Sequence, residues 1–286
     1  MSRPVLRLTL AATATALALL ATGCASDTPA ASSSTSTTST DSSADYITPG
    51  KLTIATGETA YEPYVIDDDP SSGEGFEAAV AYAVADQLGF AHEDVVWVRT
   101  SFEAAIQPGP KSFDFNIQQY TITEEREQAV DFSSPYYEAS QSVVALKGGP
   151  AEGVTDIAGL KDLVLGAMTG STSAATIEQA IQPNVEPQLY TSNEDAVAAL
   201  GTQFDALVLD TPTAYVAANF YIEDSFIVGE LPAAGVPDQW GLLLAKDSPL
   251  TERVSAAVDA LREDGTLAAL EEEWLGVFTD GITQLK

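Results

Sequence analysis

Apolar residues recur along the chain with two different periods, and these periods predict strands that alternate with helices. From Lys51 to Thr56, apolar and polar positions alternate, which is typical of a strand. Apolar residues then recur at helical spacing over 76–88, and Gly89 stands where a helix commonly ends. The next expected elements are a strand over 95–98, a helix over 102–106, a strand over 113–117 and a helix starting at 123–125. This alternation indicates an α/β fold with a mostly parallel sheet covered on both faces.

The same pattern restarts in the second part of the chain. The expected strands lie over 142–146, 163–168, 206–209 and 240–245, and the expected helices start at about Thr172 and run over 249–262 and 266–275. Two α/β units joined by strands near 144 and 242 indicate two lobes that face each other across a cleft.

The first residues have the pattern of an export signal. Arg3 and Arg7 precede an apolar, uncharged stretch over 8–21, which is too short for a permanent membrane span. Residues 26–45 are rich in Ser and Thr and cannot bury enough apolar surface to form a core. We therefore expect a signal peptide over 1–23 and a tether over 24–45 before the folded body.

The segment that ends the apolar stretch, Ala21-Thr22-Gly23-Cys24, resembles a bacterial lipobox. The resemblance implies that Cys24 is lipidated and becomes the first residue after cleavage. The alternative is an ordinary secretory signal followed by an incidental cysteine. Since this is the only Cys in the sequence, no intramolecular disulfide is expected.

The net charge of the protein limits the classes of molecule that we expect it to bind. Twelve Lys and Arg stand against 42 Asp and Glu, which gives a formal charge of −30. Such a surface repels nucleic acid and anionic lipid, so neither is an expected partner. It favours cationic or zwitterionic small molecules over dianionic ones.

Several motifs, in order over about residues 50–276, resemble one family. They are Gly75-Phe76-Glu77, DFNIQQYTITEER over 114–126, DFSSPYY over 131–137, LKDL over 160–163, GSTS over 170–173 and DALVLD over 205–210. The chain resembles the extracellular solute-binding proteins of bacterial ABC transporters, in the polar amino-acid-binding family (family 3). The resemblance implies a two-lobe periplasmic-binding-protein-like fold of type II. It would have discontinuous lobes, over 46–143 with 243–286 and over 144–242, joined by hinge strands.

Arg126 is the candidate for binding a ligand carboxylate. With Thr123 as the N-cap, Arg126 falls in the first turn of a helix, where the macrodipole disfavours a cation. An Arg beside a helix N-terminus forms a two-part anion site. The alternative is a surface ion pair with a neighbouring glutamate.

Residues of the other lobe are expected to meet the same ligand. Ser171 and Thr172 stand at a strand-to-helix turn, and the resemblance assigns Thr172 to ligand contact. Asp210 ends a strand, and the resemblance makes it the partner of a ligand ammonium. The alternative role of Asp210 is to cap the helix that begins with Thr211-Pro212.

The remaining candidate residues would contact the side chain of the ligand and determine which amino acid binds. Tyr61 and Phe102 correspond to the aromatic residues that enclose the ligand side chain in the resembling proteins. The alternative is that both only pack in the hydrophobic core. Glu58 lies at or near the family's acidic side-chain position, and is otherwise a solvated loop carboxylate. The family usually has small residues, then Met or Leu, where this chain has Gln118, Gln119 and Tyr120. Thr121 follows in the same segment and completes the predicted ligand-binding set.

The resemblance implies a binding protein that delivers a polar amino acid to an ABC permease with its ATPase. We expect a monomer, lipid-anchored on the extracytoplasmic face of the cell membrane, with no cofactor and no metal. Charge favours a basic amino acid modestly over a polar neutral one, with acidic ligands last. The alternatives are a lyase or dehydratase on the same fold, and a ligand-sensing module for a membrane receptor. His92 is the only His and lies outside the motifs, and no nucleophile motif is present, so a binder is favoured over an enzyme.

Overall fold

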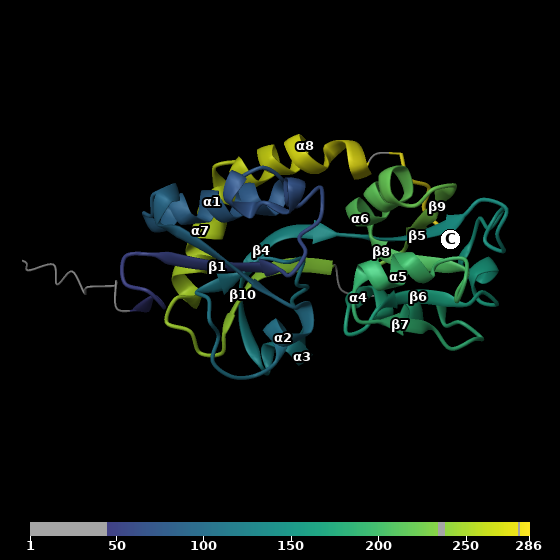
Figure 1. Cartoon of the computed structure of the whole chain (residues 1–286), viewed down its shortest axis with the longest axis horizontal. Helices are drawn as coiled ribbons and strands as arrows, with labels where there is room; N and C mark the ends of the chain where they lie inside the picture. Colours follow the sequence, from purple (N-terminus) through teal and green to yellow (C-terminus); the bar gives the residue numbers. More distant parts are fainter. Residues whose placement is uncertain (1–44, 234–237, 280) are drawn as a thin grey trace, which may run out of the picture. The chain divides into compact units, whose positions relative to one another are not determined.

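The computed structural model describes residues 45–233, 238–279 and 281–286 and contains two five-stranded mixed sheets (Figure 1). Each sheet and the helices packed on it form one lobe. The first lobe contains β1 (Leu52–Gly57), the short turns η2 (Ile66–Asp68) and η3 (Pro70–Ser72), α1 (Phe76–Leu88), η4 (His92–Asp94), β2 (Val95–Thr100), α2 (Phe102–Ile106), β3 (Phe115–Asn116), α3 (Glu124–Glu127), β4 (Val130–Ala139), β10 (Asp238–Ala245), α7 (Thr251–Glu263) and α8 (Thr266–Thr279).

The second lobe is built from the middle of the chain. It contains β5 (Gln141–Leu146), η5 (Ile157–Leu160), β6 (Leu165–Met168), α4 (Thr172–Thr176), the π-helical turn η6 (Ile177–Ile181), β7 (Gln188–Tyr190), α5 (Asn193–Ala199), β8 (Ala206–Asp210), α6 (Thr211–Val216), the π-helical turn η7 (Ala217–Tyr221) and β9 (Ser225–Leu231).

The first sheet has the order β2-β1-β3-β10-β4 and is covered on both faces. Strands β2, β1 and β3 are parallel, and β10 runs antiparallel to β3 and β4. All six residues of β1 are buried, as expected for a strand between two helical layers. One layer is α1, α7 and α8, whose apolar residues share a core with Leu52, Ile54 and Trp240. Helices α2 and α3 lie on the opposite face (Figure 1).

The second sheet has the order β7-β6-β8-β5-β9. Strands β7, β6 and β8 are parallel, whereas β5 is antiparallel to both β8 and β9. One core on this sheet includes Leu165, Ile177 and Val208, and another includes Phe204 and Leu207. The residues of β8 therefore alternate between two cores, which explains the apolar run that predicted this strand.

The passages between the lobes differ from the predicted boundaries near 144 and 242. The chain leaves the first sheet after Ala139 and enters the second at Gln141. Strand β10 pairs with β4 from Asp238 onward, so residues 238–242 extend the first sheet although we expected them in the second lobe. The polar run over 131–137 did not predict β4, which is irregular around the pairing of Pro135 with Gly241.

The last residues of the chain also pack on the second lobe, although the sequence placed them with the first. Gln284 forms a β-bridge with Glu230, and Leu285 is buried in the core that contains Leu165. Helix α8 itself belongs to the first lobe through Leu267 and Leu275. The C-terminal part of the chain thus contributes to both lobes.

Helix α8 has 14 residues, and no helix in the described part of the chain is long and apolar enough to cross a membrane. The predicted signal peptide, the lipidation site Cys24 and nearly all of the predicted tether lie outside the described residues.

Candidate functional site

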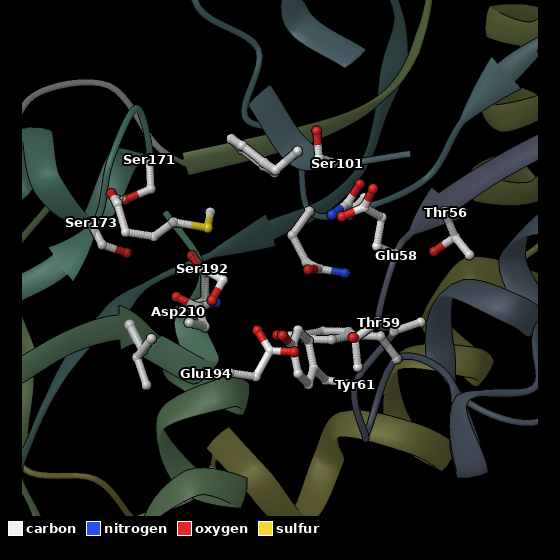
Figure 2. Close-up of a pocket in the computed structure, with 18 of the residues that line it drawn as sticks. Thr56, Glu58, Thr59, Tyr61, Ser101, Ser171, Ser173, Ser192, Glu194 and Asp210 are labelled. Carbon is white, nitrogen blue, oxygen red and sulfur yellow. Dashed lines mark hydrogen bonds between the residues drawn. The ribbon is translucent and has the colours of Figure 1, made fainter. Parts of the chain in front are cut away.

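A cavity of about 420 Å³ lies between the two lobes, at the carboxyl ends of several strands (Figure 2). The first lobe contributes Thr56, Glu58, Thr59, Ala60, Tyr61, Tyr64, Glu77, Ser101, Phe102, Gln118 and Gln119. The second lobe contributes Met168, Ser171, Thr172, Ser173, Thr191, Ser192, Asn193, Glu194, Asp195, Leu209 and Asp210. The cavity is therefore polar and is completed only when both lobes are present.

Eight of the eleven predicted ligand-binding residues line this cavity. They are Glu58, Tyr61, Phe102, Gln118, Gln119, Ser171, Thr172 and Asp210. Tyr120, Thr121 and Arg126 are buried behind the lining. Tyr120 stacks on Phe102 with ring centroids 4.5 Å apart, and its hydroxyl lies 3.0 Å from Gln118 Oε1. Tyr120 therefore supports the aromatic wall instead of forming the cleft edge.

Arg126 connects the two lobes beneath the cavity. Its Nη1 donates to the Thr121 carbonyl at 2.8 Å, and its Nη2 donates to the Gly170 carbonyl of the second lobe at 2.9 Å. The guanidinium carbon lies 5.3 Å from the centroid of the Phe102 ring. Burial lowers the pKa of Arg126, an effect that the negative charge of Asp238 opposes. Arg126 is thus a buried cation and not one member of a surface ion pair.

Asp210 and Asp238 share a single amide donor. Gln141 Nε2 donates to Asp210 Oδ1 at 2.6 Å and to Asp238 Oδ2 at 2.7 Å. Burial raises the pKa of Asp210, the charge of Asp238 raises it further, and the hydrogen bond from Gln141 opposes both. Asp210 stands at the N-cap position of α6, but its side chain makes no capping bond there. Its carboxylate is therefore available to the cavity.

Glu77 is a buried carboxylate that lines the cavity, and the sequence assigned it no role. It accepts hydrogen bonds from the Gln119 backbone N–H at 2.8 Å, from Gln119 Nε2 and from the Tyr136 hydroxyl. These bonds hold Gln119 in a left-handed conformation, with φ of 50°. Burial raises the pKa of Glu77 to about 7, against the hydrogen bonds from Tyr136 and Gln119. The sequence could have indicated this buried position, because Glu77 follows Phe76 on the buried face of a predicted helix.

At the far end of the cavity, Tyr61 faces Glu194 of the second lobe (Figure 2). Burial raises the pKa of Tyr61, and the neighbouring Glu194 carboxylate raises it further. A second contact between the lobes joins the Tyr64 hydroxyl to Thr213 Oγ1 at 3.0 Å. Glu194 lies at the start of α5, outside the motifs, so the sequence gave no reason to place it here.

Acidic side chains dominate the charge of the cavity. Glu58, Glu77, Glu194, Asp195 and Asp210 all line it, whereas none of its described lining residues is Lys, Arg or His. Within the described ranges, no group of three or more His, Cys, Asp or Glu side chains is arranged to hold a metal ion. Such a cavity favours an organic cation that also donates hydrogen bonds.

Comparison with known proteins establishes the family. A sequence model of the bacterial extracellular solute-binding proteins, family 3, matches residues 52–277. The chain belongs to this family. Membership of an extracellular solute-binding family implies a location outside the cytoplasm.

Similar proteins of this kind include binding proteins for different amino acids. The ABC transporter glutamine-binding protein GlnH of Bacillus subtilis (strain 168) is 30% identical over 212 residues, covering 72% of this chain and 75% of that protein. An ancestral arginine-binding protein is 32% identical and has been solved with arginine and with glutamine, with TM-scores of 0.63 and 0.64. Those two structures cover 79% of this chain, and 99% and 98% of theirs.

A third similar protein is a binding protein that is related to an enzyme. The ancestral amino acid-binding protein AncCDT-1, a precursor of cyclohexadienyl dehydratase, is 27% identical with a TM-score of 0.62, covering 79% of this chain and 95% of that one. The neighbours confirm the α/β, two-lobe periplasmic-binding-protein-like fold of type II that the sequence predicted for this family 3 protein.

Replacement of Glu77 by Gln tests the effect of burying this carboxylate. Because the pKa of Glu77 is raised from about 4.5 to about 7, the unfolded chain loses this proton first as the pH rises. The stability linked to Glu77 is full below about pH 4.5 and is lost by about pH 7, a change of roughly 3 kcal/mol. Unfolding by urea at a series of pH values should therefore show Glu77→Gln gaining stability over the parent across this range.

The exposed Glu74, three residues earlier, provides the matched control. Glu74→Gln removes the same charge and should follow the parent at every pH. A constant difference in stability between Glu77→Gln and the parent would contradict a raised pKa for Glu77.

Proposed function

We propose that this family 3 protein binds a polar amino acid, preferably a basic one, between its lobes and delivers it to an ABC permease. The observation that supports this most is the set of five carboxylates around a cavity whose described lining has no basic side chain. A ligand with an α-ammonium and a second cationic group balances more of this charge than a neutral amino acid does. An acidic ligand adds to the imbalance.

The ligand ammonium pairs with Asp210 in this proposal. Asp210 lines the cavity, and among the described residues its carboxylate accepts a hydrogen bond from Gln141. It retains acceptor capacity for an ammonium, since an ionised carboxylate has about four lone-pair sites. An ammonium there also relieves the repulsion between Asp210 and Asp238.

The ligand carboxylate pairs with Arg126 and with the segment of Ser171 and Thr172. The guanidinium now donates to the Gly170 carbonyl, which lies next to Ser171. In this proposal Arg126 exchanges this bond for the ligand carboxylate, which it grips with both of its terminal nitrogens. The exchange replaces a neutral acceptor with a charged one. The ligand carboxylate then links the guanidinium of Arg126 to Ser171 and Thr172 of the second lobe.

The ligand side chain extends between Phe102 and Tyr61 toward Glu58 and Glu194. The two aromatic side chains line the cavity on the first lobe, and Glu194 faces Tyr61 from the second. An aliphatic stem or planar guanidinium suits aromatic walls, and a distal cation suits the two carboxylates. Gln118 and Gln119 line the same side, although Gln119 already donates to Glu77.

Binding is favoured over catalysis by the same hydrogen bonds. The carboxylate of Glu77, whose raised pKa would suit an acid or base, already accepts three donors. It is only 1% exposed, so it is held as a structural group and not presented to a reacting atom. This distinguishes the proposed function from a lyase or dehydratase on the same fold, and we propose that the protein is not an enzyme.

The proposal includes anchoring of the body outside the membrane as a monomer. Residues 1–23 are removed as a signal peptide, Cys24 is lipidated, and residues 24–45 act as the tether. The lipobox-like segment and the Ser/Thr-rich stretch after it support this.

Calorimetric titration of residues 45–286 with arginine, lysine, glutamine and glutamate tests the ligand class. We expect the basic amino acids to bind most tightly, followed by glutamine, with glutamate last. Asp210→Asn should weaken arginine binding by about 2–4 kcal/mol, because the ligand ammonium loses a buried partner. Glu194→Gln should weaken arginine by about 1 kcal/mol and leave glutamine nearly unchanged, because it removes a partly solvated pair with the distal group.

Glu152→Gln is the control for a charge change outside the cavity. Glu152 is an exposed glutamate of the second lobe that accepts a hydrogen bond from the Gly148 backbone. The substitution should leave every affinity within a factor of about two. Tightest binding of glutamate would exclude the charge argument. Absence of binding to any of the four ligands would exclude the proposed function.

Fractionation of cells that produce the full-length protein tests the anchor. The parent should be recovered with membranes, and Cys24→Ser should be released or remain unprocessed. If the variant fractionates and migrates as the parent does, Cys24 carries no lipid.

A further inference from the structure

Asp238 lies where three groups of the ligand-binding machinery converge. Its Oδ1 accepts a hydrogen bond from Thr121 Oγ1 of the first lobe. Its Oδ2 accepts from Thr172 Oγ1 of the second lobe at 3.1 Å and from Gln141 Nε2 at 2.7 Å. Asp238 is the first residue of β10 and does not line the cavity. The sequence gave it no role, because it lies outside the motifs.

One donor that Asp238 occupies, Thr172, is among the residues expected to meet the ligand carboxylate. Thr121 and Thr172 belong to the predicted ligand-binding set, and their hydroxyl oxygens lie 3.2 Å apart across the lobes. The negative charge of Asp238 also acts on Arg126 more strongly than that of any other acidic group. The carboxylate of Asp238 thus accepts from Thr172 and acts on the charge of Arg126, the two groups that the proposed function assigns to the ligand carboxylate.

We propose that Asp238 is a built-in anion beside the carboxylate position of the cleft, and that it limits how strongly the site prefers amino acids over their decarboxylated analogues. This inference rests on the proposed function. A ligand carboxylate has to compete with Asp238 for Thr172 and for the charge of Arg126. The ligand ammonium, in contrast, gains from both Asp210 and Asp238. The site therefore rewards the amino group of a ligand more than its carboxylate.

Asp238 is a positioning and specificity-determining residue in this account, because it acts through Thr121, Thr172 and Arg126. Its carboxylate oxygens accept from both lobes, so it also helps to align the two halves of the carboxylate position. A purely structural role would affect ligands with and without a carboxylate equally. The ratio of the two affinities therefore separates the two roles.

The test compares arginine with agmatine, its decarboxylated analogue, by calorimetry on residues 45–286. We expect the parent to bind arginine less than about tenfold more tightly than agmatine. Asp238→Asn should raise this ratio by about tenfold, because the ligand carboxylate no longer competes with an internal anion, whereas the amino groups of both ligands lose the same attraction. Asp238→Glu retains the charge and should keep the ratio of the parent.

Asp247→Asn is the matched control, since it removes one negative charge from an exposed position just after β10. It should leave the ratio unchanged. If glutamine binds and arginine does not, glutamine and 4-aminobutanamide form the equivalent pair.

An unchanged ratio in a folded Asp238→Asn variant would overturn the inference and leave the proposed function standing. If that variant does not fold, the ratio of the two affinities in the parent protein is the test. A preference for the amino acid above about a hundredfold would then overturn the inference. Absence of binding to every amino acid tested would overturn both the proposed function and this inference.

Discussion

The structure depends on how one buried cation is shared among more carboxylates than it can neutralise. Arg126 lies beneath a cavity lined by Asp210 and Glu77, with Asp238 just behind it. Removing carboxylates from water is costly unless they are paired, so each of these groups either collects hydrogen bonds or holds a proton. Among the described residues, Glu77 accepts from three donors, Asp238 from three and Asp210 from one. The least satisfied carboxylate is therefore the one best placed to attract a cation from outside.

The fold produces this arrangement by joining two sheets through strands that end at the same cavity. Strand β8 ends at Asp210, and β5 begins at Gln141, which bridges Asp210 to Asp238 at the start of β10. The contact from Arg126 to Gly170 and the one from Tyr64 to Thr213 tie the lobes together on either side. A ligand that exchanges for the first of these contacts changes the bond between the lobes as it binds. In this account, ligand binding and the contact between the lobes are coupled through the same side chains.

Sequence alone predicted the α/β elements well where the apolar pattern was local, and α2 has the bounds expected for it. It did not predict β4, whose polar residues and Pro135 hide the alternation, or the boundary at β10, because pairing partners far apart in sequence decide which sheet a strand joins. Of the eight predicted residues that line the cavity, five lie in the motifs, whereas Glu58, Tyr61 and Phe102 were predicted only from their correspondence with the resembling proteins. The motifs also identified Arg126 as a cation with a special environment. Glu194 and Asp238 were missed, since only tertiary contacts bring them to Tyr61 and Thr121.

In this account the cleft holds more carboxylates than Arg126 can neutralise. Some of them, such as Asp210, hold a proton, and a cationic ligand displaces these protons. Titration of arginine in buffers of different ionisation enthalpy measures this, because the dependence of the heat on the buffer gives the number of protons exchanged. An ammonium beside Asp210 lowers its raised pKa, so binding at about pH 7 should release protons, and affinity should fall as the pH is lowered toward about 6. Binding of arginine without proton exchange, or with proton uptake at about pH 7, would contradict the account.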